Sequence, residues 1–375
     1  MSKELAAIKL DCPVEIKLED AKIQNIYTQE AYQLLKKLEF KSILKRFDGD
    51  DPDEFQLETE TIHDLIRAEE IFAQAADREQ IGISIYEEND RFWAGLSVEG
   101  QQIYLLPAEG FITKEFLLDQ ISRLYVSVES VGMMETKEYL GELKIKEETP
   151  SVFDISLAAY LINPLKSTYE YDDIARDYLS LMIPSRKELL DKKKPMAGED
   201  GLTEEGRKIL GMEAYVSRTS IVPLSRRLAE LGMMDLYRNI EIPTMFALYD
   251  MEERGIHVDR QALKDYGDQL IGRIEELQNM IYQEAGEEFN INSPKQLGIV
   301  LFEHMKLEGG KKTKTGYSTS VDVLEKIEHL YPIIPMILEY RQLTKLKSTY
   351  ADGLANFIRE DERIHGKFNQ TTTAT

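Results

Sequence analysis

A long apolar stripe between residues 260 and 285 constrains the fold more than any other feature. Its members recur at spacings of three and four: Leu263, Tyr266, Leu270, Ile274, Leu277 and Ile281. This spacing puts them on one face of a helix, and Asp259 is placed to cap its start. The stripe needs a partner, and residues 335–358 have a similar helical pattern. We therefore predict two long antiparallel helices that form an arm with a tip between them.

The tip predicted between these helices is polar and basic. Ser293 and Pro294 form a typical helix start, and residues 311–327, "KKTKTGYSTSVDVLEKI", form a basic loop that enters another helix. Ammonium groups, hydroxyls and helix starts together suit phosphate binding. The groups are Lys311, Lys312, Thr313, Lys314, Thr315, Ser318, Thr319 and Ser320. A solvated charged surface with ordinary helix caps stays open as the alternative.

Charge is distributed unevenly along the chain. The net charge is -22, yet residues 291–350 carry nine Lys or Arg against six Asp or Glu. A locally basic segment in an acidic protein indicates a phosphate-bearing partner there. No apolar run is long enough for a membrane span, no secretory signal pattern opens the chain, and Cys12 is the single cysteine. The cytoplasm is the expected location.

The first half has the pattern of an α/β domain. Three strands are expected, with a hairpin signal at Glu99 and Gly100: residues 81–88, 91–100 and 101–107. Helices are expected at residues 28–47, 113–124, 135–143, 151–164, 204–231 and 240–254. Residues 48–56 are predicted to be a linker and 184–206 a mobile loop. Gly255 should end the last helix before a short strand.

Motifs for nucleotide-binding, hydrolase or metal chemistry are missing from the sequence. The sequence contains no Walker A loop, no dinucleotide-binding glycine pattern and no GxSxG motif. The five histidines lack metal-ligand spacing: His63, His257, His304, His329 and His365. The residues alone therefore indicate a two-domain protein whose second domain binds a polyanion.

Four segments resemble the bacterial DNA polymerase I family, or family A. They are residues 288–303, 311–327, 340–354 and 364–375 ("IHGKFNQTTTAT"), in the family's order and spacing. Residues 3–16, 153–164 and 239–259 are more weakly similar, so the resemblance covers essentially the whole chain. It implies an α/β exonuclease-type (ribonuclease H-like) domain followed by a mainly α-helical thumb and the first strands of a palm. The implied activity is DNA-directed DNA polymerase in replication and repair, in the cytoplasm at the nucleoid.

The resemblance also implies domain boundaries. Residues 1–60 would be the tail of a 5′-nuclease region with its linker, and 61–235 the exonuclease-type domain. Residues 236–258 would start the polymerase domain, 259–352 would be the thumb and 353–375 the beginning of a palm.

The implied partner is primer–template duplex, bound by a monomer. Tip contacts would come from Asn292, Ser293, Lys311, Lys312, Thr313, Lys314, Ser318, Thr319 and Ser320. Arg341, Lys345 and Ser348 would continue the track on one helix face, and Asn369 and Gln370 would lie near the primer terminus.

The family's proofreading carboxylates have no counterparts in this sequence. The Asp-x-Glu positions fall at Gly82 to Ser84, and the Asp of the Tyr-x-x-x-Asp motif is Thr219 after the retained Tyr215. A hydroxyl does not supply the charge that holds Mg²⁺. We expect an inactive exonuclease-type domain with no bound metal. The alternative is a working nuclease that uses Glu87, Glu135 or Asp154.

The family's palm aspartates and fingers would follow residue 375. This chain alone is therefore expected to bind duplex, to hold no cofactor and to catalyse nothing, while the intact polymerase would use Mg²⁺. A stand-alone DNA-binding or scaffold protein derived from a polymerase is the alternative. The strand expected at 364–370 should be frayed or poorly packed.

Overall fold

The computed structural model describes residues 31, 34, 35, 43, 55–89, 91–190, 195–198, 201–314 and 316–373. Most of the predicted helix at 28–47, most of the linker at 48–56 and Thr315 lie outside the described residues. The chain divides into two compact units, Met1–Tyr237 with Thr371–Thr375, and Arg238–Gln370. Each unit is described by itself.

The first unit is built on a six-stranded sheet in the order β1-β4-β3-β2-β5-β6. Its strands are β1 (Glu58–Thr61), β2 (Gln80–Glu88), β3 (Arg91–Ser97), β4 (Gln102–Pro107), β5 (Ser130–Met133) and β6 (Val152–Asp154). β2, β3 and β4 are antiparallel neighbours, as predicted, whereas the β1–β4, β2–β5 and β5–β6 pairs are parallel. The three short strands were not predicted, and β6 lies inside the helix expected at 151–164.

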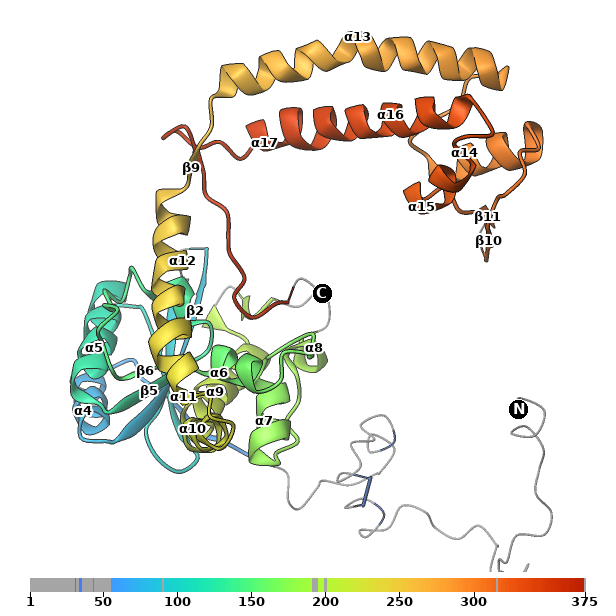
Figure 1. Cartoon of the computed structure of the whole chain (residues 1–375). Helices are drawn as coiled ribbons and strands as arrows, with labels where there is room; N and C mark the ends of the chain where they lie inside the picture. The colour runs from blue at the N-terminus through green and yellow to red at the C-terminus, as the bar shows by residue number, and fades with distance from the viewer. Residues whose placement is uncertain are drawn as a thin grey trace, which may run out of the picture. The chain divides into compact units, whose positions relative to one another are not determined.

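Helices flank this sheet (Figure 1). They are α4 (Leu65–Ala76), α5 (Lys114–Ser127), η1 (Thr136–Tyr139), α6 (Ile155–Ile162), α7 (Tyr171–Leu179), α8 (Arg186–Leu189), α9 (Glu204–Thr219), α10 (Ile221–Glu230) and α11 (Met234–Leu236). Two predictions were wrong in detail. The helix expected at 135–143 is only the 3₁₀ turn η1, and the helix expected at 204–231 breaks at Ser220.

The segment predicted as a mobile loop, residues 184–206, contains regular structure. α8 begins with a capping box in which the Ser185 and Glu188 side chains each accept from the other's backbone N–H. β7 (Ala197–Gly198) and β8 (Gly201–Leu202) then pair antiparallel. The described part of this segment is therefore fastened locally, which the polar composition did not indicate.

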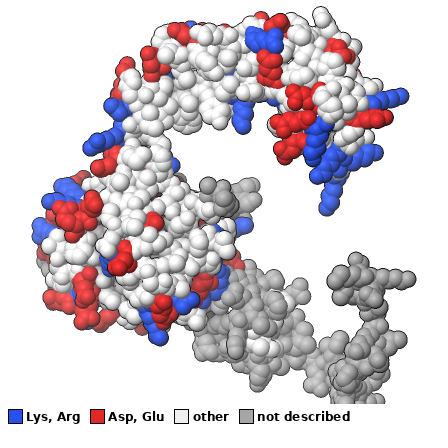
Figure 2. Space-filling view, in the orientation of Figure 1, with Lys and Arg blue, Asp and Glu red and all other residues white. Residues whose placement is uncertain are grey.

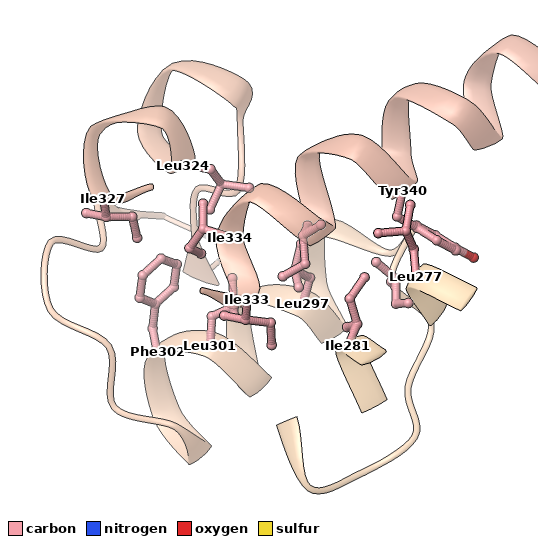
Figure 3. Close-up of a cluster of buried hydrophobic side chains, with 12 residues drawn as sticks. Leu277, Ile281, Leu297, Leu301, Phe302, Leu324, Ile327, Ile333, Ile334 and Tyr340 are labelled. Atoms are coloured by element: carbon pink, nitrogen blue, oxygen red, sulfur yellow. The ribbon is translucent and has the colours of Figure 1, made fainter. Parts of the chain in front are cut away.

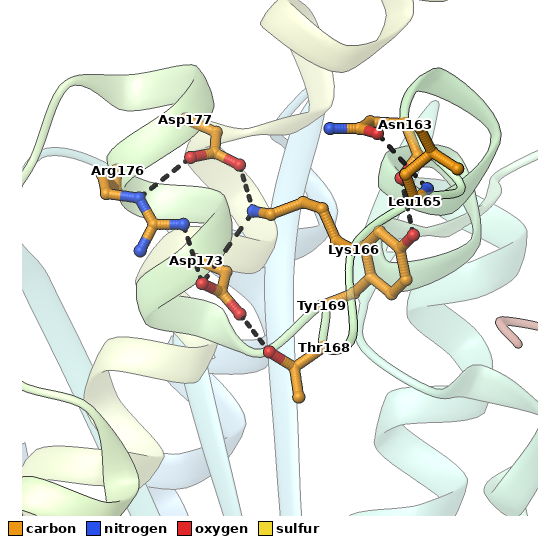
Figure 4. Close-up of polar contacts among 8 residues, drawn as sticks. All are labelled: Asn163, Leu165, Lys166, Thr168, Tyr169, Asp173, Arg176 and Asp177. Carbon is orange, nitrogen blue, oxygen red and sulfur yellow. Dashed lines mark hydrogen bonds and ion pairs between the residues drawn. The ribbon is translucent and has the colours of Figure 1, made fainter. Parts of the chain in front are cut away.

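The connection between α6 and α7 is held by a polar network (Figure 4). The Lys166 ammonium pairs with Asp177, and the Arg176 guanidinium donates to Asp173 at 2.8 Å. Thr168 Oγ1 donates to Asp173 Oδ2 at 2.7 Å, and Tyr169 donates to the Asn163 carbonyl at 2.6 Å. Burial alone would raise the pKa of Asp173, but these hydrogen bonds and cations lower it.

The second unit contains the arm that the stripe predicts. Its elements are η2 (Tyr237–Glu241), α12 (Ile242–Arg254), β9 (Ile256–His257), α13 (Arg260–Ala285), α14 (Pro294–Ile299), η3 (Val300–His304), β10 (Lys312–Thr313), β11 (Gly316–Tyr317), α15 (Val321–Leu324), η4 (Glu325–Ile327), α16 (Ile333–Lys345), η5 (Leu346–Asp352), α17 (Gly353–Ala355) and β12 (Arg363–Ile364). α13 and α16 run side by side in opposite directions (Figure 1). The predicted caps are present, because Asp259 accepts from two backbone N–H groups of α13 and Gly255 has a φ of 61°.

An apolar cluster joins the arm to its tip (Figure 3). Its members are Leu277, Ile281, Ile291, Leu297, Leu301, Phe302, Leu324, Ile327, Ile333, Ile334, Ile337 and Tyr340. The predicted stripe supplies Leu277 and Ile281, and Ile274 packs against the cluster. Tyr266, however, is 44% exposed, so the stripe is buried mainly toward the tip.

The segment after the arm differs from its prediction. The strand at 364–370 shrinks to β12, whose two residues pair antiparallel with β9. Beyond it, the chain is tied to α12. His365 Nδ1 lies 2.8 Å from the Glu252 carbonyl oxygen, Phe368 N–H donates to Glu252 Oε1 at 2.6 Å, and Gln370 Nε2 donates to the Glu241 carbonyl at 2.8 Å. The described part is thus hydrogen-bonded to Glu241 and Glu252, while residues 366–369 stay exposed. Fraying of this end stays a prediction.

Among the described residues, no helix is both long and apolar enough to cross a membrane.

Candidate nucleic-acid interface

A basic hairpin stands at the tip of the arm. β10 and β11 pair Lys312 with Tyr317 and Thr313 with Gly316, and Ser318 N–H donates to the Lys311 carbonyl at 2.8 Å. Gly316 adopts a φ of 138°, a conformation that side chains disfavour. The three lysines Lys311, Lys312 and Lys314 are all exposed. Figure 2 shows basic side chains gathered where this hairpin lies.

Two packed aromatic rings, Tyr317 and Phe302, connect the hairpin to the rest of the tip. Lys312 Nζ lies 5.5 Å from the centroid of the Tyr317 ring, and the Tyr317 and Phe302 ring centroids are 5.0 Å apart. The Phe302 ring in turn lies against Gly310. Sequence reasoning did not single out Tyr317. Its signal was present, however, as an aromatic residue inside a run of lysines and hydroxyls, where it attracts a cation.

The predicted hydroxyls have different surroundings. Ser318 and Ser320 hydroxyls lie 3.3 Å apart, and Ser320 is exposed at the start of α15, where its side chain makes no capping bond. Ser293 caps α14 by accepting from Gln296 N–H at 3.4 Å, as its position before Pro294 predicts. Asn292 beside it is exposed. Both α14 and α15 are short, with six and four residues.

Two of the predicted contacts face each other inside the tip. Arg341 Nη1 donates to the Thr319 carbonyl at 2.8 Å, Nη2 lies 3.4 Å from Thr319 Oγ1, and Nε donates to the Ile291 carbonyl at 3.3 Å. Thr319 is only 5% exposed. Burial lowers the pKa of Arg341 from its ordinary value, although a guanidinium stays charged in proteins. This pair therefore organises the interior of the tip.

The remaining predicted positions are spread out. Lys345 and Ser348 are exposed, but α16 ends at Lys345 and the π-helix η5 follows, which changes the spacing of side chains. Because Arg341 turns inward, these three residues do not share the solvent-facing helical stripe that was expected. Asn369 is exposed, and Gln370 is bonded to Glu241.

The positions where the proofreading carboxylates were sought lie against α9. A Cβ atom at Gly82 would lie 2.1 Å from the Ala214 carbonyl oxygen, and Ser84 Oγ donates to the Leu210 carbonyl at 2.7 Å. Thr219 Oγ1 donates to the Tyr215 carbonyl within α9 at 2.8 Å. Gly82 and Ser84 thus lie directly against α9, whose backbone fills the room that larger side chains would need there.

Two of the other carboxylates considered for nuclease chemistry, Glu87 and Asp154, bind groups of the protein itself. Glu87 accepts from the Lys114 ammonium at 2.6 Å. Asp154 caps α6 by accepting from Leu157 N–H at 2.8 Å and also accepts from Thr136 N–H at 2.7 Å. Burial raises the pKa of Asp154, and these hydrogen bonds oppose the rise. Within the described part of the chain, no three His, Cys, Asp or Glu side chains are grouped as metal ligands.

Comparisons with known proteins agree on one family. Residues 260–375 match the family model "DNA polymerase family A". The whole chain aligns with DNA polymerase I of Bacillus subtilis (strain 168) at 34% identity and of Caldicellulosiruptor bescii at 35% identity. It spans 43% and 41% of the length of these two relatives.

A solved structure has a similar fold. It is the polymerase domain of Pol1 from M. smegmatis, determined in complex with DNA primer-template and dNTP. The match has a TM-score of 0.65 and 24% sequence identity, and it covers 84% of this chain and 53% of that one.

Proposed function

We propose that the chain is part of a DNA-directed DNA polymerase of the DNA polymerase I type, on the premise that residues 260–375 match DNA polymerase family A and the whole chain aligns with DNA polymerase I relatives. Its own role would be to hold primer–template duplex. The observation that carries this role is the exposed triad Lys311, Lys312 and Lys314 on the hairpin at the end of the arm. The segment 291–350 is basic in a chain of net charge -22, so a polyanion would be attracted to this place above others.

The proposed contacts are with the DNA backbone. Ammonium and hydroxyl groups bind phosphate and sugar oxygens, which position a duplex without reading its sequence. Exposed groups are proposed to touch DNA directly: Asn292, Lys311, Lys312, Thr313, Lys314, Ser320, Lys345, Ser348 and Asn369. Groups that are half-buried or buried are proposed to shape the surface from inside: Ser293, Ser318, Thr319, Arg341 and Gln370.

The proposed domain organisation follows the family. Residues 61–235 would be an exonuclease-type domain, 236–258 the start of the polymerase domain, 259–352 the thumb and 353–375 the beginning of a palm. Residues 1–60, proposed as the tail of a 5′-nuclease region with its linker, lie mostly outside the described residues.

The exonuclease-type domain is proposed to be inactive. Two-metal hydrolysis requires carboxylates that hold both ions about 4 Å apart. Glycine and hydroxyl side chains at Gly82, Ser84 and Thr219 do not fit that role, and the backbone of α9 lies against the first two. No step of proofreading is therefore assigned to this chain.

Family A polymerases generally depend on Mg²⁺, which lowers the barrier to nucleotidyl transfer by stabilising charge on the attacking and leaving oxygens. No residue of this chain is assigned to hold those ions.

Binding of the purified chain to a fluorescein-labelled primer–template, followed by anisotropy, tests the proposed role. We expect saturable binding to the duplex that weakens steadily as salt rises, because counterions compete for the phosphates. Absence of binding at about 50 mM salt, a condition that favours electrostatic contacts, would contradict the proposal.

A further inference from the structure

Arg341 lies between two loops that are far apart in the sequence. It projects from α16, and its guanidinium reaches Ile291, 50 residues earlier, and Thr319, 22 residues earlier. Every hydrogen bond that is described for Arg341 goes to an uncharged oxygen: two backbone carbonyls and one hydroxyl. The described hydrogen bonds of this charged side chain thus hold the protein's own backbone and one hydroxyl.

Each carbonyl that Arg341 holds lies next to an exposed polar group. Ile291 is buried and precedes Asn292, which is exposed just before α14. Thr319 is buried and precedes Ser320, which is exposed just before α15. One guanidinium therefore fixes the backbone immediately beside both polar groups.

The chemistry of the side chain suits this task. A guanidinium carries five N–H donors in a rigid planar fork, so it holds several acceptors at set angles. A lysine at the same place keeps the positive charge but has a flexible stem and a single nitrogen. It would leave at least one of the two carbonyls without its donor.

We propose that Arg341 is a positioning residue that sets the two loops, residues 290–293 and 318–320, in one arrangement before any nucleic acid is bound. The distance between Asn292 and Ser320 is then already fixed in the free protein. Binding of duplex therefore does not have to order these loops. The part of this inference that concerns DNA rests on the proposed function. The arrangement of the loops in the free protein does not.

Hydrogen exchange of the DNA-free full chain tests the arrangement itself. In Arg341→Lys we expect amides of residues 289–293 and 316–321 to exchange at least about fivefold faster, because at least one loop loses its hydrogen bond to a charged group and the two loops are no longer held together. Thr319→Val keeps the shape of the side chain and removes one acceptor, so a smaller acceleration is expected. Lys345→Gln, a change on the same helix at an exposed lysine, should leave these amides unchanged. Exchange in Arg341→Lys that matches the unaltered chain would overturn the proposal.

Duplex binding supplies the second test. Arg341→Lys keeps the charge, so we expect about tenfold weaker binding, with the slope of log K against log salt unchanged. Adding Thr319→Val to Arg341→Lys should have no further effect, since both residues belong to one contact. If the double variant instead loses as much binding free energy as the two single variants together, the proposal is overturned. If the unaltered chain binds no duplex, the proposed function fails, while the exchange experiment still decides whether Arg341 sets the loops.

Discussion

The Ala214 carbonyl oxygen on α9 lies 2.1 Å from the place that a Cβ atom of Gly82 on β2 would occupy. Strand and helix therefore meet backbone to backbone at this point. Gly132 on β5 meets the Ser217 carbonyl in the same way, at 2.0 Å. α9 can pack this close to the sheet only because these strand residues lack side chains.

A methyl group at Gly82 should destabilise the first unit. We expect Gly82→Ala to lower the free energy of unfolding by about 2–3 kcal/mol, because helix or strand must move to admit the added atom. Gly211→Ala on α9 is the matched control. Its Cβ would meet Leu57 and Ile103 at 3.5 and 3.6 Å, ordinary contact distances. Alanine there should change stability by less than about 1 kcal/mol, in the stabilising direction. Urea titrations of both variants measure the difference, and equal midpoints would refute the packing argument.

The chain should release no nucleotides from a single-stranded 3′ end in Mg²⁺. Rebuilding an Asp-x-Glu motif with Gly82→Asp and Ser84→Glu should not create that activity, because α9 fills the space where the carboxylates would stand. The assay uses a 5′-labelled oligonucleotide and denaturing gels. Release by the unaltered chain that disappears in Glu135→Gln would show that unrecognised carboxylates do form a site.

The arm should be stabilised by its apolar cluster far more than by its surface ion pairs. Leu277 is fully buried, so Leu277→Ala should cost about 2–5 kcal/mol. Arg273 donates to both carboxylate oxygens of Glu339 at 2.8 Å, yet these side chains are 44% and 42% exposed. Glu339→Gln should therefore cost at most about 1 kcal/mol. Hydrogen exchange of the most protected amides in α13 and α16 measures the loss of stability in both variants. A larger loss in Glu339→Gln than in Leu277→Ala would reverse this ranking.

The segment after β12 should loosen as pH rises. His365 Nε2 lies 2.9 Å from Asp361 Oδ2, and Nδ1 faces the Glu252 carbonyl, so both ring nitrogens face acceptors. Only the protonated ring donates to both. Asp361, and then the Glu252 carbonyl, raise the pKa of His365, while Arg359 opposes the rise.

The direction of the pH effect follows from the raised pKa of His365. Stability from His365 is fully present below its unfolded pKa of about 6.5 and is lost as pH rises through the higher folded value. Asp361→Asn should shift the His365 titration downward. NMR titration of the His365 ring, with the protection factor of the Phe368 amide, checks this. A Phe368 amide equally protected from pH 5 to 8, a range spanning the ordinary histidine pKa, would contradict it.

Local sequence signals predicted most of the arm. The spacing of Leu277 and Ile281, the cap at Asp259 and the Ser293–Pro294 start each depend on neighbours within a few positions, and each is present. The short strands β5 and β6 were missed because segments of three or four residues are too short for their pattern to distinguish a strand from the end of a helix.

Tertiary contacts decided the rest. Arg341 turns inward because two carbonyls from distant loops meet it there, and nothing in "YRQLTK" indicates their position. At Gly82 the sequence indicated a missing carboxylate. It did not indicate that a helix backbone takes its place, since that contact joins residues more than a hundred positions apart.

The most direct test of the central claim removes the charge of the lysine hairpin. Lys311, Lys312 and Lys314 are changed together to Gln, and Lys144, Lys146 and Lys187, exposed lysines of the first unit, are changed together as the charge-matched control. We expect the hairpin variant to bind primer–template more weakly and to lose up to about 3 from the slope of log K against log salt, about 0.9 for each phosphate contact. The control should keep the original slope. A hairpin variant with an unchanged slope, or a control that loses as much, would contradict the claim that this tip holds the duplex.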